Sequence, residues 1–202
     1  MKPTEHLVKL IDAVSDSDRI QHGRERQIIS LQQYVEPMSF ILHEGSAGVY
    51  RTSDNLLILN IKAPVIVGLN FLEKENNDFY LQARQAIRYE IVPRALLKEK
   101  VIKNNMWESI SYAYMHVAHR FLEYHFVSVG VPTYSLIRNN LIELMKENDD
   151  IRLSTNACDY VQERTLLSRS GIMKILGDLK KGGHIEIKRG VLMKIDHLPE
   201  KY

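Results

Sequence analysis

The sequence predicts an α+β protein in three parts: a β-roll over residues 1–92, a long helix and hinge over 93–130, and a winged helix-turn-helix over 131–202. Short apolar runs alternate with polar residues in the first part, an apolar repeat of helical spacing fills the second, and capped helices precede a hairpin pattern in the third. The chain is long enough for one large or two small domains, and its 45% hydrophobic content is that of a globular protein that can bury a core.

The first part begins with an amphipathic helix and continues as strands. Residues 4–14 place Leu7, Leu10, Ile11 and Val14 on one helical face. From about residue 23 to residue 92 the pattern changes to short apolar runs separated by Gly, Pro, Asn, Asp and Ser, which indicates a small antiparallel sandwich or roll. The runs fall at 28–31, 40–42, 48–50, 56–61, 65–68, 79–81 and 87–92.

The second part is helical from Pro93 to about Ser128, and its apolar residues recur every three or four positions. They form a seam that is longer than a single roll can cover. Its members are Met106, Ile110, Ala113, Val117, Phe121 and Tyr124. Residues 129–133 break the helix and supply a hinge, since they contain Gly130 and Pro132. A further helix is expected at 134–148, followed by a short strand at 151–153.

The third part has the spacing of a helix-turn-helix with a wing. Ile172, Ile175, Leu176 and Leu179 form one stripe of a helix from Ser168, a good N-cap, to the stop at Gly182. A short helix with Ala157, Tyr160 and Val161 on its apolar stripe precedes it, and the turn at 165–167 connects the two. Residues 184–194 alternate around a Gly-containing turn, which predicts a β-hairpin.

Charge supports a polyanionic partner for this part. From residue 164 to residue 194 there are eight Lys or Arg against Asp178 and Glu186, a local net charge of +6, whereas residues 1–132 sum to zero. A basic hairpin beside a helix of this kind predicts binding to double-stranded DNA.

The run Arg164-Thr165-x-x-Ser168-Arg169-Ser170, continued by the apolar stripe and by Gly183-x-Ile185, resembles the C-terminal domain of bacterial regulators of the cyclic-AMP receptor/fumarate-nitrate regulator superfamily. The ending 188–202 is similar to an enterobacterial branch described as inhibitors of hydrogen peroxide resistance. The resemblance implies a homodimer that pairs through the long helix and reads a palindromic operator, and it implies control of a stress programme, such as peroxide resistance, or of a surface programme.

The resemblance also implies roles for individual residues. Arg169, Ser170 and Lys174 take the positions that read bases in the major groove. The positions expected to contact phosphate are Thr165, Ser168, Lys181, Lys188 and Arg189.

The roll departs from the nucleotide-binding members of the superfamily. Where those members carry a Gly-Glu-Leu motif and an Arg-Ser pair, this chain has Gly68-Leu69-Asn70-Phe71-Leu72 and Phe79-Tyr80. The carboxylate and guanidinium that hold a cyclic phosphate are missing, so the roll is expected to be degenerate and to act without a cyclic nucleotide. With Cys158 as its single cysteine, the chain cannot hold an iron–sulfur cluster. No cofactor is expected, and an effector or protein partner stays open.

Other candidate site residues have less support from the sequence than the DNA-binding residues. Cys158 could sense peroxide but fits an apolar filler better, because no Lys or Arg is its immediate neighbour. His116, His119 and His125 lack a carboxylate partner at metal-binding spacing, and His43-Glu44 lacks the further ligands of a metal-binding roll.

The motifs of the common enzyme classes are absent, so no catalysis is expected. The alternative is a non-catalytic adaptor that binds a protein through the roll and holds DNA weakly. Without a signal-peptide core or a run of about 20 apolar residues, the protein is expected in the cytoplasm and off the membrane.

Overall fold

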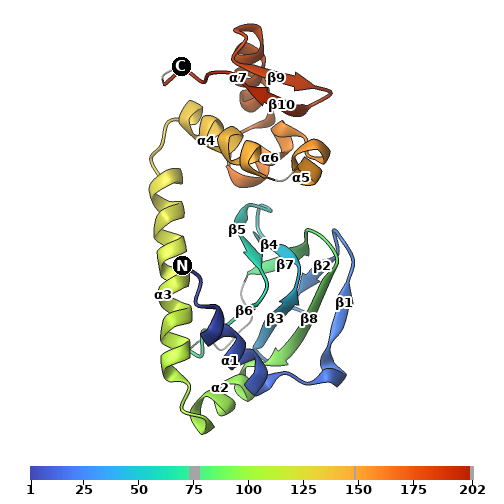
Figure 1. Cartoon of the computed structure of the whole chain (residues 1–202), viewed down its shortest axis with the longest axis vertical. Helices are drawn as coiled ribbons and strands as arrows, with labels where there is room; N and C mark the ends of the chain where they lie inside the picture. Colours follow the sequence, from blue (N-terminus) through green and yellow to red (C-terminus); the bar gives the residue numbers. More distant parts are fainter. Residues whose placement is uncertain (73–77, 148, 201–202) are drawn as a thin grey trace. The chain divides into compact units, whose positions relative to one another are not determined.

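The computed structural model of this chain describes residues 1–72, 78–147 and 149–200 (Figure 1). The chain folds into two compact units, Met1–Leu122 and Glu123–Tyr202. As the sequence predicts, strands dominate the first unit, and helices with a terminal hairpin form the second. None of the helices within the described ranges is both long and apolar enough to cross a membrane.

Two four-stranded antiparallel sheets make the roll of the first unit, with strand orders β1-β8-β3-β6 and β2-β7-β4-β5. The strands are β1 (Gln21–Gly23), β2 (Ile28–Ser30), β3 (Met38–Glu44), β4 (Ser46–Arg51), β5 (Leu57–Lys62), β6 (Val65–Val67), β7 (Phe79–Ala83) and β8 (Ile87–Pro93). Gly45 turns β3 into β4 with a φ of +88°, and a Cβ atom there would lie 2.6 Å from the carbonyl oxygen of Ala86. Each of the seven apolar runs in the sequence overlaps one of the strands β2 to β8, so the predicted strands are confirmed.

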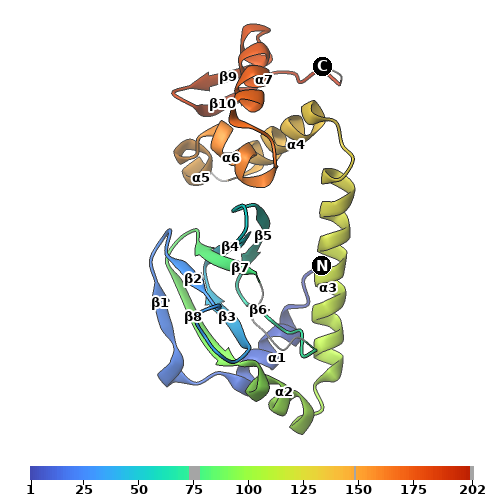
Figure 2. The ribbon, with the colours of Figure 1, turned by 180° about the vertical axis from the view of Figure 1, so that it is seen from behind.

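The sequence missed β1. Its three residues carry no large apolar side chain, so no alternation marks it, and it joins the sheet by pairing with β8 at the outer edge seen in Figures 1 and 2. The roll interior is filled by apolar side chains from both sheets. The fully buried ones with the largest volumes are Leu31, Phe40, Leu42 and Leu81.

Helices pack a second cluster against the roll. α1 (Thr4–Val14) buries Leu7, Leu10, Ile11 and Val14, as predicted. The expected single helix is two helices, α2 (Arg94–Lys103) and α3 (Trp107–Ser128), because Asn105 adopts a φ of +50° and ends the first. Met106, Ile110 and Ala113, which the sequence assigns to a seam between chains, are 3%, 6% and 4% exposed and belong to this cluster, so they are not free to contact a partner.

A buried carboxylate fastens the start of the chain to the roll. Glu90 in β8 is fully buried, and its oxygens lie 2.8 Å from Nε2 of His43 and 3.3 Å from Nε of Arg19, which follows α1 in the short η1 helix (Ser17–Arg19). Glu44 pairs with Arg88 at 2.9 Å. Both members of the His43-Glu44 pair, considered above as metal ligands, are thus engaged by other side chains.

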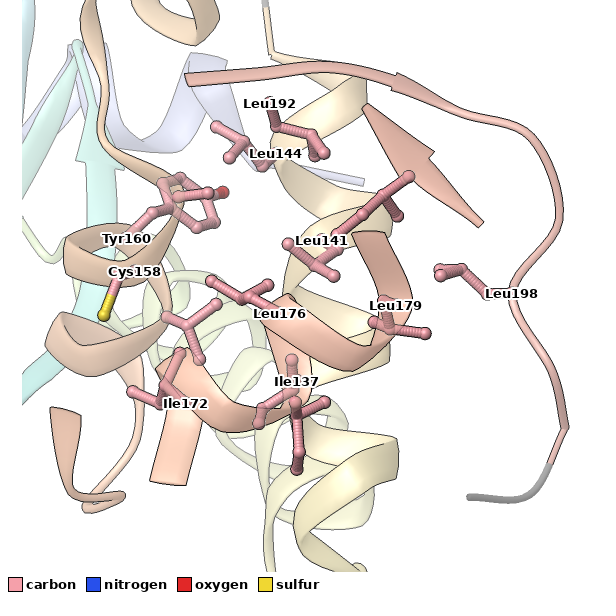
Figure 3. Close-up of a cluster of buried hydrophobic side chains, with 14 of the residues drawn as sticks. Ile137, Leu141, Leu144, Cys158, Tyr160, Ile172, Leu176, Leu179, Leu192 and Leu198 are labelled. Atoms are coloured by element: carbon pink, nitrogen blue, oxygen red, sulfur yellow. The ribbon is translucent and has the colours of Figure 1, made fainter. Parts of the chain in front are cut away.

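The second unit contains α4 (Thr133–Lys146), α5 (Asp149–Ser154), α6 (Ala157–Arg164), α7 (Arg169–Lys181), β9 (Ile185–Lys188) and β10 (Val191–Ile195). Side chains from α4, α6, α7, β10 and the C-terminal segment converge on one core (Figure 3). The strand predicted at 151–153 is wrong. Those residues lie in α5, where Arg152 pairs with Asp149 at 2.7 Å and donates to the carbonyls of Leu192 and Met193, so α5 packs on β10 as a helix.

Candidate nucleic-acid interface

The two helices of the helix-turn-helix begin at side-chain caps. The side-chain oxygen of Asn156 accepts from the backbone N–H groups of Cys158 (2.9 Å) and Asp159 (3.4 Å) at the start of α6. Ser168 accepts from the N–H of Gly171 (3.2 Å) at the start of α7, which confirms the predicted N-cap. These bonds satisfy donors that have no partner inside the helix, so they set where each helix begins.

One face of α7 is buried, and the other is open. Ile172, Ile175, Leu176 and Leu179 are each at most 7% exposed, and they pack on α4 and α6 in the core drawn in Figure 3. The opposite side presents an exposed set at the start of the helix, namely Arg169, Ser170, Met173 and Lys174. This is how a recognition helix must be held if its side chains are to enter a groove.

The wing is a tight hairpin. β9 and β10 are antiparallel with Lys188 opposite Val191, and the two residues between them, Arg189 and Gly190, have φ values of +50° and +86°. Positive φ at both positions is the pattern of a type I′ turn, whose twist matches that of the flanking strands. The N–H of Ala157 donates to the carbonyl of Gly190 at 2.8 Å, so the tip of the wing is tied to the start of α6.

The three positions expected to read bases are all exposed on the first two turns of α7. Arg169 opens the helix, and Nη1 of its guanidinium donates to Oδ1 of Asp159 in α6. The Ser170 hydroxyl lies 3.2 Å from that of Ser168. Lys174 follows one turn later, so the three side chains share one accessible region of the helix.

Four of the five expected phosphate contacts are exposed: Ser168, Lys181, Lys188 and Arg189. Thr165 is not, because it is 8% exposed and its hydroxyl donates to the carbonyl of Val161 at 2.9 Å. The hydroxyl also accepts from the N–H of Leu167 at 3.4 Å. Thr165 therefore holds the turn between the helices, and we exclude it from the phosphate contacts.

The charge that faces solvent is smaller than the local count of +6. The guanidinium of Arg164 stacks over the ring of Tyr160 at 3.4 Å and pairs with Glu163 at 3.2 Å, so it is directed into its own unit. Lys188 pairs with Glu186 at 2.8 Å, and Lys194 pairs with Asp196. Arg169 is likewise paired, with Asp159 of α6. The electrostatic field of the interface is therefore carried mainly by Lys174, by the last turn of α7 and by Arg189 in the wing turn.

Cys158 belongs to the core of the same unit. It is 2% exposed, and burial raises the pKa of its thiol, with a smaller opposing effect of the Arg169 charge. A raised pKa disfavours the thiolate, which is the form that reacts with peroxide.

The roll segment at the position of the nucleotide-binding motif is bonded to and packed against other residues of the roll and its helices. The carbonyl of Gly68 accepts from the Ser39 hydroxyl at 2.8 Å, and the carbonyl of Asn70 accepts from Nη1 of Arg94 at 3.0 Å. Leu69 is 8% exposed and packs in the cluster of α1 and α2. The Tyr80 hydroxyl donates to the side chain of Asn55 at 3.0 Å.

Two residues of the interface were not picked out from the sequence. Met173 is 52% exposed one turn after Arg169, where an apolar side chain can contact the methyl group of thymine. Its position on the outward stripe of the predicted helix was the available signal. Asp159 was missed because its pairing with Arg169 joins two helices ten residues apart, which no local pattern reveals.

Comparison with known proteins agrees with this architecture. Residues 133–200 match the family model described as winged helix-turn-helix DNA binding. The chain is 28% identical over 205 residues to the inhibitor of hydrogen peroxide resistance of Escherichia coli (strain K12), and 26% identical to the protein of that name in Salmonella typhimurium. Each alignment covers 100% of this chain and 98% of the relative.

Solved structures of similar fold cover most of the chain. The c-di-GMP responsive global regulator CLP of Xanthomonas campestris superposes with a TM-score of 0.76 at 12% identity, over 96% of this chain and 100% of that one. A CRP-family transcriptional regulator of Thermus thermophilus superposes with a TM-score of 0.61 at 14% identity, over 87% and 92%. The resemblance found in the sequence is confirmed: the chain has the fold of CRP-family regulators and carries a winged helix-turn-helix DNA-binding domain.

Proposed function

We propose that this chain is a homodimeric transcriptional regulator that binds DNA sequence-specifically through α7 and the β9–β10 wing, without a cyclic nucleotide. The observation that carries the proposal is the arrangement of α7, whose apolar face is closed by the core while Arg169, Ser170, Met173 and Lys174 stay exposed beside a basic hairpin. Such a surface is matched to a groove lined by phosphates.

The two parts of the surface have different tasks. Side chains at the start of α7 reach base edges, because a helix that enters the major groove presents its first turns to them. Lys181, Lys188 and Arg189 contact the phosphates on either side and fix the orientation of the helix, a contribution that weakens as salt rises. Base preference is therefore assigned to α7, and general affinity to the wing and to the last turn of α7.

An exposed apolar face on α3 supports the homodimer. Its residues recur at helical spacing and are between 42% and 75% exposed. They are Tyr114, Met115, Val117, Phe121, Leu122 and Phe126. A contiguous apolar face of this kind is seldom left in water, and a second copy of the same helix covers it in a symmetric way. Two recognition helices held about 34 Å apart would then read the two halves of a palindrome.

The contacts of the roll support independence from cyclic nucleotides. A cyclic phosphate needs a charged or hydrogen-bonding partner. At the corresponding segments Leu69 is buried, and the backbone of residues 68 and 70 is bonded to Ser39 and Arg94. Apolar side chains fill the interior of the roll.

The names of the relatives suggest the biological role. Proteins called inhibitor of hydrogen peroxide resistance align with the full length of this chain. We propose that the chain likewise regulates genes of a peroxide stress response. Mapping of genomic fragments bound in cells with and without peroxide tests this, and enrichment that avoids stress genes under both conditions would contradict it.

Selection of bound fragments from a random duplex pool tests DNA recognition directly. The full chain should enrich a palindromic sequence at physiological salt, and cyclic AMP should leave its affinity unchanged. A chain that enriches no sequence while still retaining DNA weakly would instead be the adaptor described above. A requirement for cyclic AMP would disprove the proposed independence.

A further inference from the structure

The guanidinium of Arg169 is held by an acidic residue from the neighbouring helix. Nη1 of Arg169, the first residue of α7, donates to Oδ1 of Asp159, in the first turn of α6. Both side chains are more than half exposed. The Asp159 backbone is fixed in turn, because its N–H donates to the capping side chain of Asn156.

We propose that Asp159 is a specificity-determining residue that positions Arg169 for guanine. Its carboxylate takes a hydrogen of Nη1 and leaves the Nε and Nη2 hydrogens to donate together to O6 and N7 of one guanine. This inference rests on the proposed function, since it concerns how the same helix reads DNA.

The shape of the guanidinium is the first reason. Arginine presents five N–H donors in a rigid planar fork, so one edge can be bonded to a carboxylate while another makes a bidentate contact. A long unrestrained side chain loses rotamer freedom when it binds, and a side chain that is already held loses less. The Asp159 contact therefore favours the one geometry in which the fork meets a base.

Helix electrostatics is the second reason. A cation at the first residue of a helix is disfavoured by the helix dipole, whereas a carboxylate in a first turn is favoured. Arg169 and Asp159 occupy these two places. Asp159 thus neutralises an unfavourable position of Arg169 while its own position is stabilised by α6.

The third reason is discrimination against phosphate. Double-stranded DNA carries a dense row of negative charge, and a carboxylate beside Arg169 repels it. A guanine edge is uncharged, so a base contact is penalised much less than a phosphate contact. Asp159 should accordingly lower affinity for random duplex and raise the preference of Arg169 for its base.

The wing provides a matched control. Glu186 pairs with Lys188 at 2.8 Å, and this pair is also exposed. Neutralising Glu186 removes the same single charge from the same surface. Lysine, however, is a point charge without a fork to orient, so this change should affect affinity without affecting base choice.

The experiment compares wild type, Asp159→Asn, Asp159→Glu and Glu186→Gln on three duplexes over a series of salt concentrations. The duplexes are the selected operator, the operator with the guanine read by Arg169 replaced, and a random sequence. For Asp159→Asn we expect the preference for guanine to fall about tenfold, and affinity for the random duplex to rise. Asp159→Glu should keep most of the preference, and Glu186→Gln should strengthen binding to all three duplexes alike.

A double variant separates positioning from a general structural effect. In an Arg169→Ala background, Asp159→Asn should no longer change the base preference, because no fork is left to orient. Exposed ion pairs contribute little to stability, so all variants should melt close to wild type.

Two results would overturn the inference. In the first, wild type and Asp159→Asn show the same base preference; Asp159 then has no positioning role, and the proposed function is unaffected. In the second, wild type shows no base preference; the proposed function and the role of Asp159 are then both disproved.

Discussion

A Cβ atom on residue 190 would come within 2.2 Å of Nδ2 of Asn156. Gly190 forms the turn of the wing, and Asn156 caps the first helix of the helix-turn-helix. The wing and the cap are therefore in direct contact, and they are joined further by the backbone bond from Ala157 to Gly190. This contact ties the turn of the basic hairpin to the start of α6.

Gly190→Ala should displace the wing. The substitution meets the Asn156 side chain and also needs a φ of +86°, a conformation that costs a non-glycine residue about 1–3 kcal/mol. We expect a lower melting temperature and weaker binding to every duplex, measured by calorimetry and by titration. Gly177→Ala in α7 is the control, because open space surrounds residue 177 and alanine should stabilise the helix by about 0.5–1 kcal/mol. Equal stability of the two variants would contradict the assigned contact.

Arg169→Ala and Lys188→Ala should fail in different ways. Loss of Arg169 removes a base contact, so binding to the operator should approach binding to a random duplex. Loss of Lys188 removes a phosphate contact, so all duplexes should be weakened alike and the slope of log affinity against log salt should fall by about 1. Titrations at several salt concentrations measure both quantities. If both variants bound like wild type, α7 and the wing would not form the interface.

Phe121→Glu should give a monomer. Phe121 is 56% exposed on the apolar face of α3, and a charge there opposes burial against a second copy. Sedimentation equilibrium should show a dimer for wild type and a monomer for the variant, with operator affinity reduced because half-sites are then bound singly. Ile28→Glu is the control, since Ile28 is 60% exposed on β2 and lies outside α3. A dimer that survives Phe121→Glu would place the interface elsewhere.

Tyr160 should ionise only at strongly alkaline pH. Burial raises the pKa of its phenol from 10.0 to about 12, although the Arg164 guanidinium opposes the change and Glu147 adds to it. Because the folded pKa lies above the unfolded one, the contribution to stability is complete below about pH 10 and is lost as pH rises through about 12.

Tyr160→Phe tests the raised pKa of the Tyr160 phenol and its hydrogen bond to Glu147. The variant lacks the hydrogen bond from the phenol to Glu147 (3.2 Å) and should lose about 1 kcal/mol of stability at neutral pH. Its stability should then fall less than that of wild type between pH 10 and 12. Its absorbance titration at 295 nm should lack one component near pH 12. A component lost near pH 10 instead would mean that the phenol is accessible.

Most of the fold was predictable because its signals are local. The stripe of α1, the alternating runs of the roll and the capped stripe of α7 each occupy a few consecutive turns or strand residues, and burial of those faces forces the element. The N-cap at Ser168 and the wing turn at 189–190 follow from side-chain and glycine chemistry within three residues. Elements without such a signal were missed or misassigned, as β1 and α5 illustrate.

The candidate site was predictable only in part, for a related reason. Periodicity places Ser170 and Lys174 opposite the apolar stripe of the predicted helix, and the family resemblance adds Arg169. Periodicity cannot tell, however, which apolar residues of a long helix are buried within the same chain. Met106, Ile110 and Ala113 fit one seam with Val117 and Phe121, yet they are buried against α1 and α2. Likewise the charge count treats Arg164 as it does Arg169, although the first stacks on Tyr160.

Amino-acid order thus established the helical and strand segments, the outward stripe of the recognition helix and the likeness to CRP-family regulators, since each depends on neighbours within a few residues. Tertiary folding decided which charges face solvent, which apolar residues remain uncovered, and that Asp159 meets Arg169. These are contacts between segments distant in sequence, and their existence depends on how separate elements pack.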